Sequence, residues 1–117
     1  MRTDANQDVT GRAFVFRLIP RRPSFALDLS GAEQAVMARH AEHWRPLIDS
    51  GQMVVFGPTL DETGSWGLGI VEAADEAELR ALAASDPAVV AGIAEIELGT
   101  MLGGFVRARE CPRAGVP

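Results

Sequence analysis

The sequence has 117 residues, with 11 basic and 16 acidic side chains and a formal net charge of -5. This length predicts one domain with one core, and the acidic balance argues against a nucleic-acid partner, because no basic stripe is available to contact phosphates. The first ten residues are polar and no run of 18 apolar residues occurs, so neither a signal peptide nor a membrane-spanning segment is predicted. We therefore expect a cytoplasmic protein without a membrane partner.

The first predicted element is a strand. Residues 13–19 are rich in β-forming side chains, and Pro20 ends the run. The flanking residues, 1–12 and 20–29, are predicted to be a disordered lead and a loop.

A long helix follows this loop. Ser30 and Glu33 form a capping box, which satisfies the first free backbone donors of a helix. The helical pattern runs to Ser50, and Gly51 can adopt the left-handed conformation that ends a helix. Pro46 removes one backbone hydrogen bond and is expected to bend the last turn.

The second half of the chain predicts a hairpin, two helices and a last strand. Residues 52–56 and 65–72 are predicted strands, joined by a turn region over 57–64. A second capping box, Asp75 with Glu78, starts the next helix.

Asp86 and Pro87 start a short helical segment, with the aspartate as N-cap and the proline where its missing N–H costs nothing. Alternating polar and apolar residues over 95–101 then predict a half-exposed strand.

The order β-α-β-β-α-β predicts an α+β, ferredoxin-like fold, with an antiparallel four-stranded sheet and helices on one face. We place this single domain at residues 13–106 and a flexible tail at 107–117. Cys111 is the sole cysteine and lies in the tail, so neither an intrachain disulfide nor a thiol-based metal cluster is expected.

The candidate site begins with a histidine on the long helix. Helical spacing places Val36, His40, Trp44 and Leu47 on one stripe, which should face the sheet. A buried imidazole without hydrogen-bond partners costs roughly 1 to 3 kcal/mol, so His40 is expected to meet a polar group. His43 lies at the edge of the stripe and is the weaker candidate.

The candidate site residues, which also include Asp86, Gly57, Pro58 and Trp66, each have a purely structural interpretation as well. His40 can be a core histidine held by a backbone carbonyl or by Asp86, and Asp86 can be a helix cap alone. Gly57 and Pro58 can simply end a strand, and Trp66 can fill the core.

Other chemistries find little support in the sequence. Gly67 and Gly69 open one face of a strand to a close neighbour or a ligand, but they do not complete a dinucleotide fingerprint. No phosphate-binding loop or serine-nucleophile elbow is present. His40 and His43 have a spacing that suits two ligands of one metal, yet no cysteine or third histidine completes the set. We expect no cofactor and no metal.

Two segments resemble the YciI-like (YCII-related) family. Residues 40–58, HAEHWRPLIDSGQMVVFGP, are similar to the family's core pattern of a histidine, a helix ending in glycine, a strand and a Gly-Pro close. Residues 85–92, SDPAVVAG, resemble its second block, an Asp-Pro pair followed by a small-residue turn. The resemblance covers residues 14–101.

This resemblance implies a dimeric α+β barrel in which the sheets of two subunits face each other, with His40 and Asp86 as the active-site pair. Most members have no established reaction, although one related branch removes chloride from chlorinated aromatic rings. The long lead and the long loop over 20–30 depart from the family pattern and are expected to reshape the mouth of the pocket. The substrate-binding residues are then expected to be His43, Gly57, Pro58 and Trp66.

Two hypotheses remain for the function. In the first, Asp86 orients His40, which acts as general acid or base of a lyase or hydrolase type on an unknown small molecule. In the second, the pair is structural, in a ligand-binding or assembly module. We predict the two side chains within about 2.6 to 3.2 Å, or one water apart. An imidazole edge that opens to a pocket favours the enzyme.

The sheet face without helices is expected to be apolar, through Phe14, Phe16, Val55 or their neighbours, and to form a homodimer.

Overall fold

The computed structural model describes residues 6–8 and 12–107. Its elements are β1 (Asn6–Asp8), β2 (Ala13–Pro20), the short 3-10 helix η1 (Phe25–Leu27), α1 (Gly31–Ser50), β3 (Met53–Asp61), β4 (Gly64–Glu72), α2 (Glu76–Ala84), α3 (Pro87–Val90), β5 (Ala94–Thr100) and β6 (Phe105–Arg107). The main sheet has the order β3-β4-β2-β5, and all of its neighbours are antiparallel. The predicted α+β, ferredoxin-like fold is confirmed.

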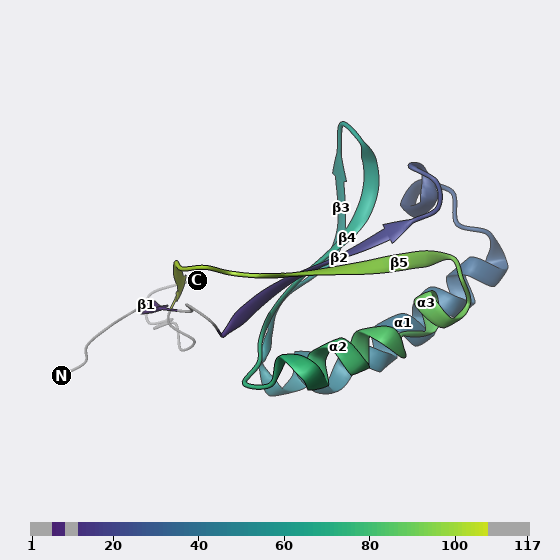
Figure 1. Ribbon diagram of the computed structural model, residues 1–117. Coiled ribbons are helices and arrows are strands. Elements are labelled where there is room, and N and C mark those ends of the chain that lie inside the picture. Colours follow the sequence, from purple (N-terminus) through teal and green to yellow (C-terminus); the bar gives the residue numbers. More distant parts are fainter. Residues whose placement is uncertain (1–5, 9–11, 108–117) are drawn as a thin grey trace, which may run out of the picture.

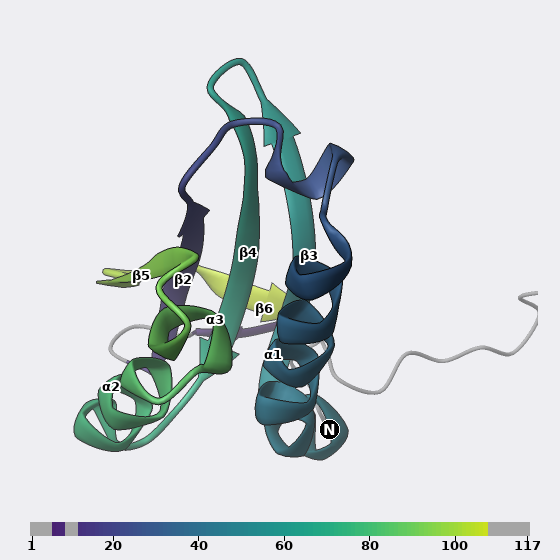
Figure 2. The same ribbon diagram turned by 90° about the vertical axis from the view of Figure 1, so that its right-hand side faces the viewer.

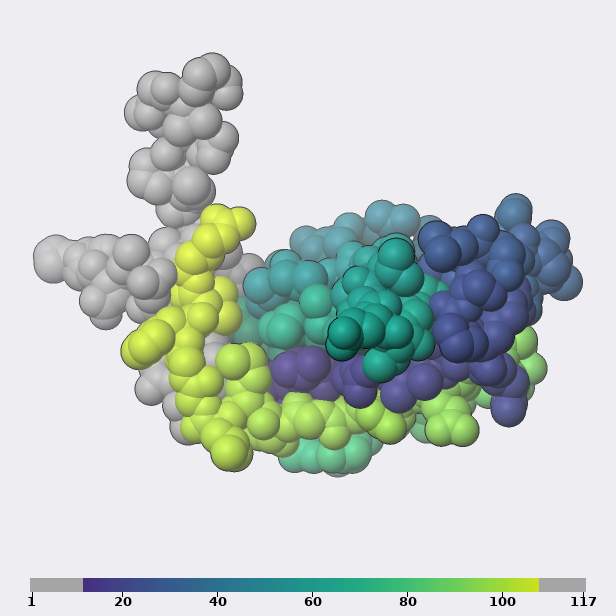
Figure 3. Space-filling model, turned by 90° about the horizontal axis from the view of Figure 1, so that it is seen from above, coloured from purple at the N-terminus to yellow at the C-terminus, as the bar shows by residue number. Residues whose placement is uncertain are grey.

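The helices α1, α2 and α3 lie together on one side of this sheet (Figures 1 and 2). Phe14, Phe16 and Leu18 of β2 point to that side and are buried in one core with Trp44 of α1. Figure 3 looks onto the opposite face, where β2 and β5 run side by side. No helix of the described residues covers that face.

Phe14 and Phe16 therefore do not lie on the uncovered face, and the expectation was wrong for these two residues, although it holds for Val55 and for their neighbour Val15. Alternation places neighbouring residues on opposite faces of a strand, but it does not say which face the helices will cover. The uncovered face instead carries Val15, Ile70 and Val55, which are paired across three adjacent strands. Val55 is 45% exposed, as expected for this face.

The strand β3 is longer than predicted. Gly57 and Pro58 lie inside β3, opposite Leu68 and Gly67 of β4, so the prediction of a turn region over 57–64 was wrong. A proline is tolerated there because β3 is an edge strand, where a missing N–H need not break the ladder.

The turn itself is confined to the end of the hairpin. The Asp61 carboxylate accepts hydrogen bonds from the backbone N–H and the hydroxyl of Thr63, and Gly64 follows with a φ of 119°.

The predicted signals for helix starts and stops are largely present. Ser30 and Glu33 form the reciprocal capping box of α1, and Gly51 ends the helix with a φ of 85°. Asp75 caps α2 by accepting from the backbone N–H groups of Ala77 and Glu78. Short polar side chains at these positions thus set where the helices begin.

A small second sheet lies away from the helices. The strands β1 and β6 pair antiparallel, with Gln7 opposite Val106. β1 falls within residues 1–12, for which the sequence predicts disorder. The local sequence gives no sign of this strand, because its partner β6 lies far along the chain. Cys111 and most of the predicted tail lie outside the described residues.

None of the helices in the described part of the chain combines the length and hydropathy that crossing a membrane requires.

Candidate functional site

The predicted histidine and aspartate meet inside the domain. The Nδ1 atom of His40, on α1, lies 2.7 Å from the Oδ2 atom of Asp86, at the start of α3. Both side chains are buried, His40 at 7% and Asp86 at 0% exposure. A carboxylate can only accept hydrogen bonds, so Nδ1 carries the proton of this bond.

The Asp86 carboxylate has two further donors. The indole Nε1 of Trp44 donates to the same Oδ2 atom at 2.6 Å, and the backbone N–H of Ala88 donates to Oδ1 at 2.8 Å. The bond from Ala88 shows that Asp86 also caps α3, so capping and orienting are combined in one side chain.

These contacts set the charge of Asp86. Burial by itself raises the pKa of the Asp86 carboxyl, because it removes water from the anion. The hydrogen bonds from His40, Trp44 and Ala88 outweigh burial, and the net pKa lies below the usual value of 3.8. Asp86 is therefore an anion at neutral pH, although it is fully enclosed.

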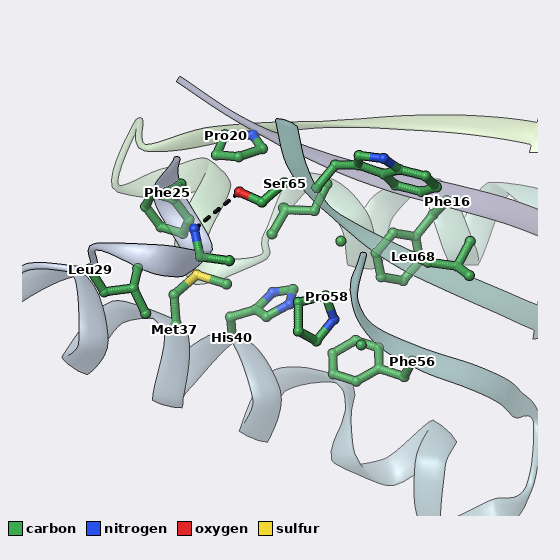
Figure 4. A pocket seen from close by; sticks show the side chains of 15 residues that line it. Phe16, Pro20, Phe25, Leu29, Met37, His40, Phe56, Pro58, Ser65 and Leu68 are labelled. Atoms are coloured by element: carbon green, nitrogen blue, oxygen red, sulfur yellow. Dashed lines mark hydrogen bonds between the residues drawn. The ribbon is translucent and has the colours of Figure 1, made fainter. Parts of the chain in front are cut away.

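A cavity of about 250 Å³ adjoins the imidazole of His40 (Figure 4). It lies between α1, the sheet and the loop over 20–30. Among the described residues, its lining contains no Asp, Glu, Lys or Arg side chain. The lining residues are Phe16, Leu18, Pro20, Phe25, Ala26, Leu29, Met37, His40, Phe56, Gly57, Pro58, Ser65, Trp66, Gly67 and Leu68.

The second ring nitrogen of His40 is available to this cavity. With Nδ1 bound to Asp86, Nε2 has no hydrogen-bond partner among the described residues. The imidazole is stacked on Phe56, with ring centroids 5.3 Å apart. The ring is thus held on one edge by Asp86 and on one face by Phe56.

Ser65 also contributes a polar side chain to the lining, but its hydroxyl is occupied. It donates to the carbonyl oxygen of Pro23 at 2.9 Å and accepts from the backbone N–H of Ala26 at 3.1 Å. These two hydrogen bonds attach the loop over 20–30 to β4 beside the cavity.

The loop over 20–30, which the sequence predicts to reshape the mouth of the pocket, contributes lining residues that were not among the predicted site residues. Phe25, 5% exposed, and Leu29 line the cavity together with Ala26. Arg22 holds the base of the loop through two hydrogen bonds to Glu33 of α1, at 2.7 and 2.8 Å. The apolar run Phe25-Ala26-Leu27 within a predicted loop was the feature of the sequence that could have indicated these lining residues.

The four predicted substrate-binding residues divide into two groups. Gly57 and Pro58 line the cavity. His43 does not, because its Nε2 donates to the backbone carbonyl of Leu82 at 2.7 Å, between α1 and α2.

Trp66 belongs to the lining, but its indole lies on the uncovered side of the sheet. Strand register places Trp66 on the face opposite Gly67, and the guanidinium of Arg17 lies 4.6 Å from the centre of its ring. The indole N–H donates to Asp61 at 2.9 Å.

The two alternating glycines of β4 have a packing role. A Cβ atom on Gly69 would overlap the ring of Phe16, and one on Gly67 would lie 3.0 Å from the Cβ atom of Leu18. They accommodate bulky neighbours from β2, the more common use of glycine in a strand.

The comparison with family models adds to this geometry. The family model of the YCII-related domain matches residues 13–101. The chain belongs to the YCII-related domain family. This match includes every element of the main sheet, all three helices and the His40–Asp86 pair.

A solved structure has the same fold as this YCII-related domain. It is the 5-chloro-2-hydroxyhydroquinone dehydrochlorinase of Burkholderia phenoliruptrix in complex with 2,5-dihydroxybenzoquinone, with a TM-score of 0.55 and 20% sequence identity. The alignment covers 75% of this chain and 92% of the dehydrochlorinase chain. At this identity the likeness establishes the fold. Comparison with curated protein sequences finds no match.

Proposed function

We propose that this chain is a small-molecule enzyme in which His40 is the general acid or base and Asp86 is its orienting carboxylate. The observation that carries the proposal is the division of the imidazole: Nδ1 is bound to Asp86 at 2.7 Å, while Nε2 is left to the cavity. Histidine can take up and release a proton near neutral pH, and a fixed partner keeps the reactive nitrogen pointed at the ligand.

The cavity supports a compact, mainly apolar ligand. In the part of the chain that the structure describes, the lining offers no charged side chain to pair with a phosphate or a carboxylate. Its volume, about 250 Å³, exceeds the roughly 150 Å³ of an engineered apolar cavity that binds benzene, so a single substituted ring has room. The dehydrochlorinase of the same fold was solved with a ring compound bound, which agrees with this class.

We propose that the working form is a homodimer. The uncovered sheet face carries a row of Val15, Ile70 and Val55, flanked by Leu68. A monomer would leave this row in water, whereas a second copy would bury it. A cytoplasmic location also remains a prediction from the sequence.

The function is tested through proton transfer. The purified protein is incubated in D₂O with small cyclic ketones and hydroxyquinones, and exchange of their acidic C–H hydrogens is followed by NMR. We expect the wild-type protein to accelerate exchange of at least one probe, and His40→Asn to lose 10²- to 10⁴-fold of the acceleration, the usual contribution of a general acid or base.

The matched control is His43→Asn, which changes the other histidine of α1 outside the cavity lining. It should keep the exchange rate, and the melting temperature of His40→Asn should stay within a few degrees of wild type, because asparagine can retain one polar contact. Binding without exchange would support the alternative, a non-catalytic ligand-binding module. A collapse of stability in His40→Asn would indicate a structural pair.

A further inference from the structure

We propose that Trp44 is a positioning residue. It determines which ring nitrogen of His40 carries the proton, and it does so through Oδ2 of Asp86, to which both side chains are hydrogen-bonded. The proposal rests on the proposed function, since the state of His40 matters to a reaction only if Nε2 acts on a ligand. Trp44 lies outside the cavity lining, so it acts on the site through Asp86.

The first observation is the convergence of two donors from one helix. His40 and Trp44 are four residues apart on α1, which places them on the same face. Nδ1 of His40 and Nε1 of Trp44 reach the same Oδ2 atom of Asp86, at 2.7 and 2.6 Å. An oxygen that holds two N–H donors is fixed more firmly than an oxygen that holds one.

The second observation is that Trp44 is packed on several sides. Its side chain is 0% exposed, and its ring is stacked on Phe16 with centroids 4.9 Å apart. The ring of His43 packs against it edge to face, with centroids 5.5 Å apart. Packing in the core therefore sets the direction in which the indole N–H points toward Asp86.

The chemical consequence concerns the two nitrogens of His40. Oxygens that receive hydrogen bonds from Trp44 and from the backbone of Ala88 favour the carboxylate over the acid, and a carboxylate can only accept. Nδ1 of a neutral His40 must then carry the ring proton, and Nε2 is left as a bare acceptor facing the cavity. Trp44 thus favours the tautomer that a general base needs.

The test replaces the indole N–H and changes little else. β-(3-Benzothienyl)alanine at position 44 keeps the shape of the indole with a sulfur in place of the N–H, and Trp44→Phe is the genetically encoded counterpart. ¹⁵N NMR of the imidazole reports which nitrogen of neutral His40 is protonated, and ¹³C NMR of the carboxyl reports the titration of Asp86. His40 is the titratable side chain in contact with Asp86 among the described residues.

We expect wild-type His40 to show a protonated Nδ1 and a bare Nε2. Both variants at position 44 remove one of the two donors that hold Oδ2 of Asp86. We therefore expect Oδ2 to hold Nδ1 of His40 less firmly, the imidazole signals to shift toward a mixture of tautomers, and the pKa of Asp86 to rise. Val71→Ala removes two methyl groups from the same core but none of the three hydrogen bonds of Asp86, so it should lower stability and leave both signals in place. Unchanged signals in a folded position-44 variant would overturn the proposal.

The readout needs no turnover, so this test and the test of the proposed function can fail separately. A shifted tautomer in a protein that never accelerates exchange would uphold the positioning role and remove the enzyme. Accelerated exchange together with an unchanged tautomer in the position-44 variants would support the enzyme and overturn the positioning role of Trp44.

Discussion

At the residue scale, Asp86 joins helix capping, charge and orientation in one side chain. Its oxygens receive three N–H donors, and it has no exposed surface. An aspartate before a proline indicates only a helix start when the sequence is considered alone. The two donors from α1 give it a second role.

We predict that the Asp86 carboxylate adds stability that acid removes. The pKa of Asp86 in the folded protein lies below its usual value of 3.8, so its contribution is complete above that value and is lost as the pH falls through the folded pKa. Asp86→Asn should lose roughly 1 to 3 kcal/mol at pH 7, since its amide N–H₂ cannot accept a hydrogen bond.

Urea unfolding of both proteins between pH 7 and pH 2 measures this difference. Glu33, whose pKa is lowered to about 2 by its hydrogen bonds from Arg22, makes the wild-type protein acid-sensitive as well. The difference in the free energy of unfolding between wild type and Asp86→Asn isolates the Asp86 contribution, and this difference should become smaller toward pH 2. A gap that stays constant would contradict the prediction.

At the element scale, β4 and α1 are held together by an aromatic stack that needs a glycine. Phe16 lies over Gly69 of β4 and is stacked on Trp44 of α1, which in turn donates to Asp86. The packing of the strand and the geometry of the site therefore depend on each other.

We predict that Gly69→Ala destabilises the domain by about 1 to 3 kcal/mol, because the new methyl group displaces the Phe16 ring in a close-packed core. The control is Gly31→Ala at the start of α1, where a Cβ atom meets nothing within 4 Å and the stability should hold. Thermal unfolding of both variants checks this. A Gly69→Ala protein as stable as wild type would mean that Phe16 moves without cost.

At the scale of the whole molecule, one face of the sheet has helices and the other has an aliphatic row. Ile70 lies in the middle of that row, paired with Val15 on one side and Val55 on the other. Such a row, extended over neighbouring strands, is typical of a surface that pairs with another.

We predict that sedimentation at micromolar concentration gives about twice the 12.5 kDa mass of the chain. Ile70→Lys should give the single-chain mass, because the dimer would enclose an unpaired charge. Val90→Lys, on the exposed side of α3 at 72% exposure, should leave the dimer intact. A single-chain mass for the wild-type protein would contradict the dimer.

The sequence by itself determined the features that depend on neighbouring residues. Ser30 with Glu33, and Gly51, define the ends of α1, since capping acts within one helical turn. The element order, and with it the ferredoxin-like fold, follows from the same local patterns. The pairing of His40 with Asp86 was also predictable, because both helices of this fold cover one face of the sheet.

The tertiary structure alone decided features that depend on distant residues. Pro58 lies within a strand because β3 is at the edge of the sheet, and Phe16 faces inward because the helices cover that face. His43 turns to a carbonyl on α2, away from the cavity. Helical periodicity fixes the angle at which a side chain leaves its own helix, whereas the group that it meets there depends on how the elements pack.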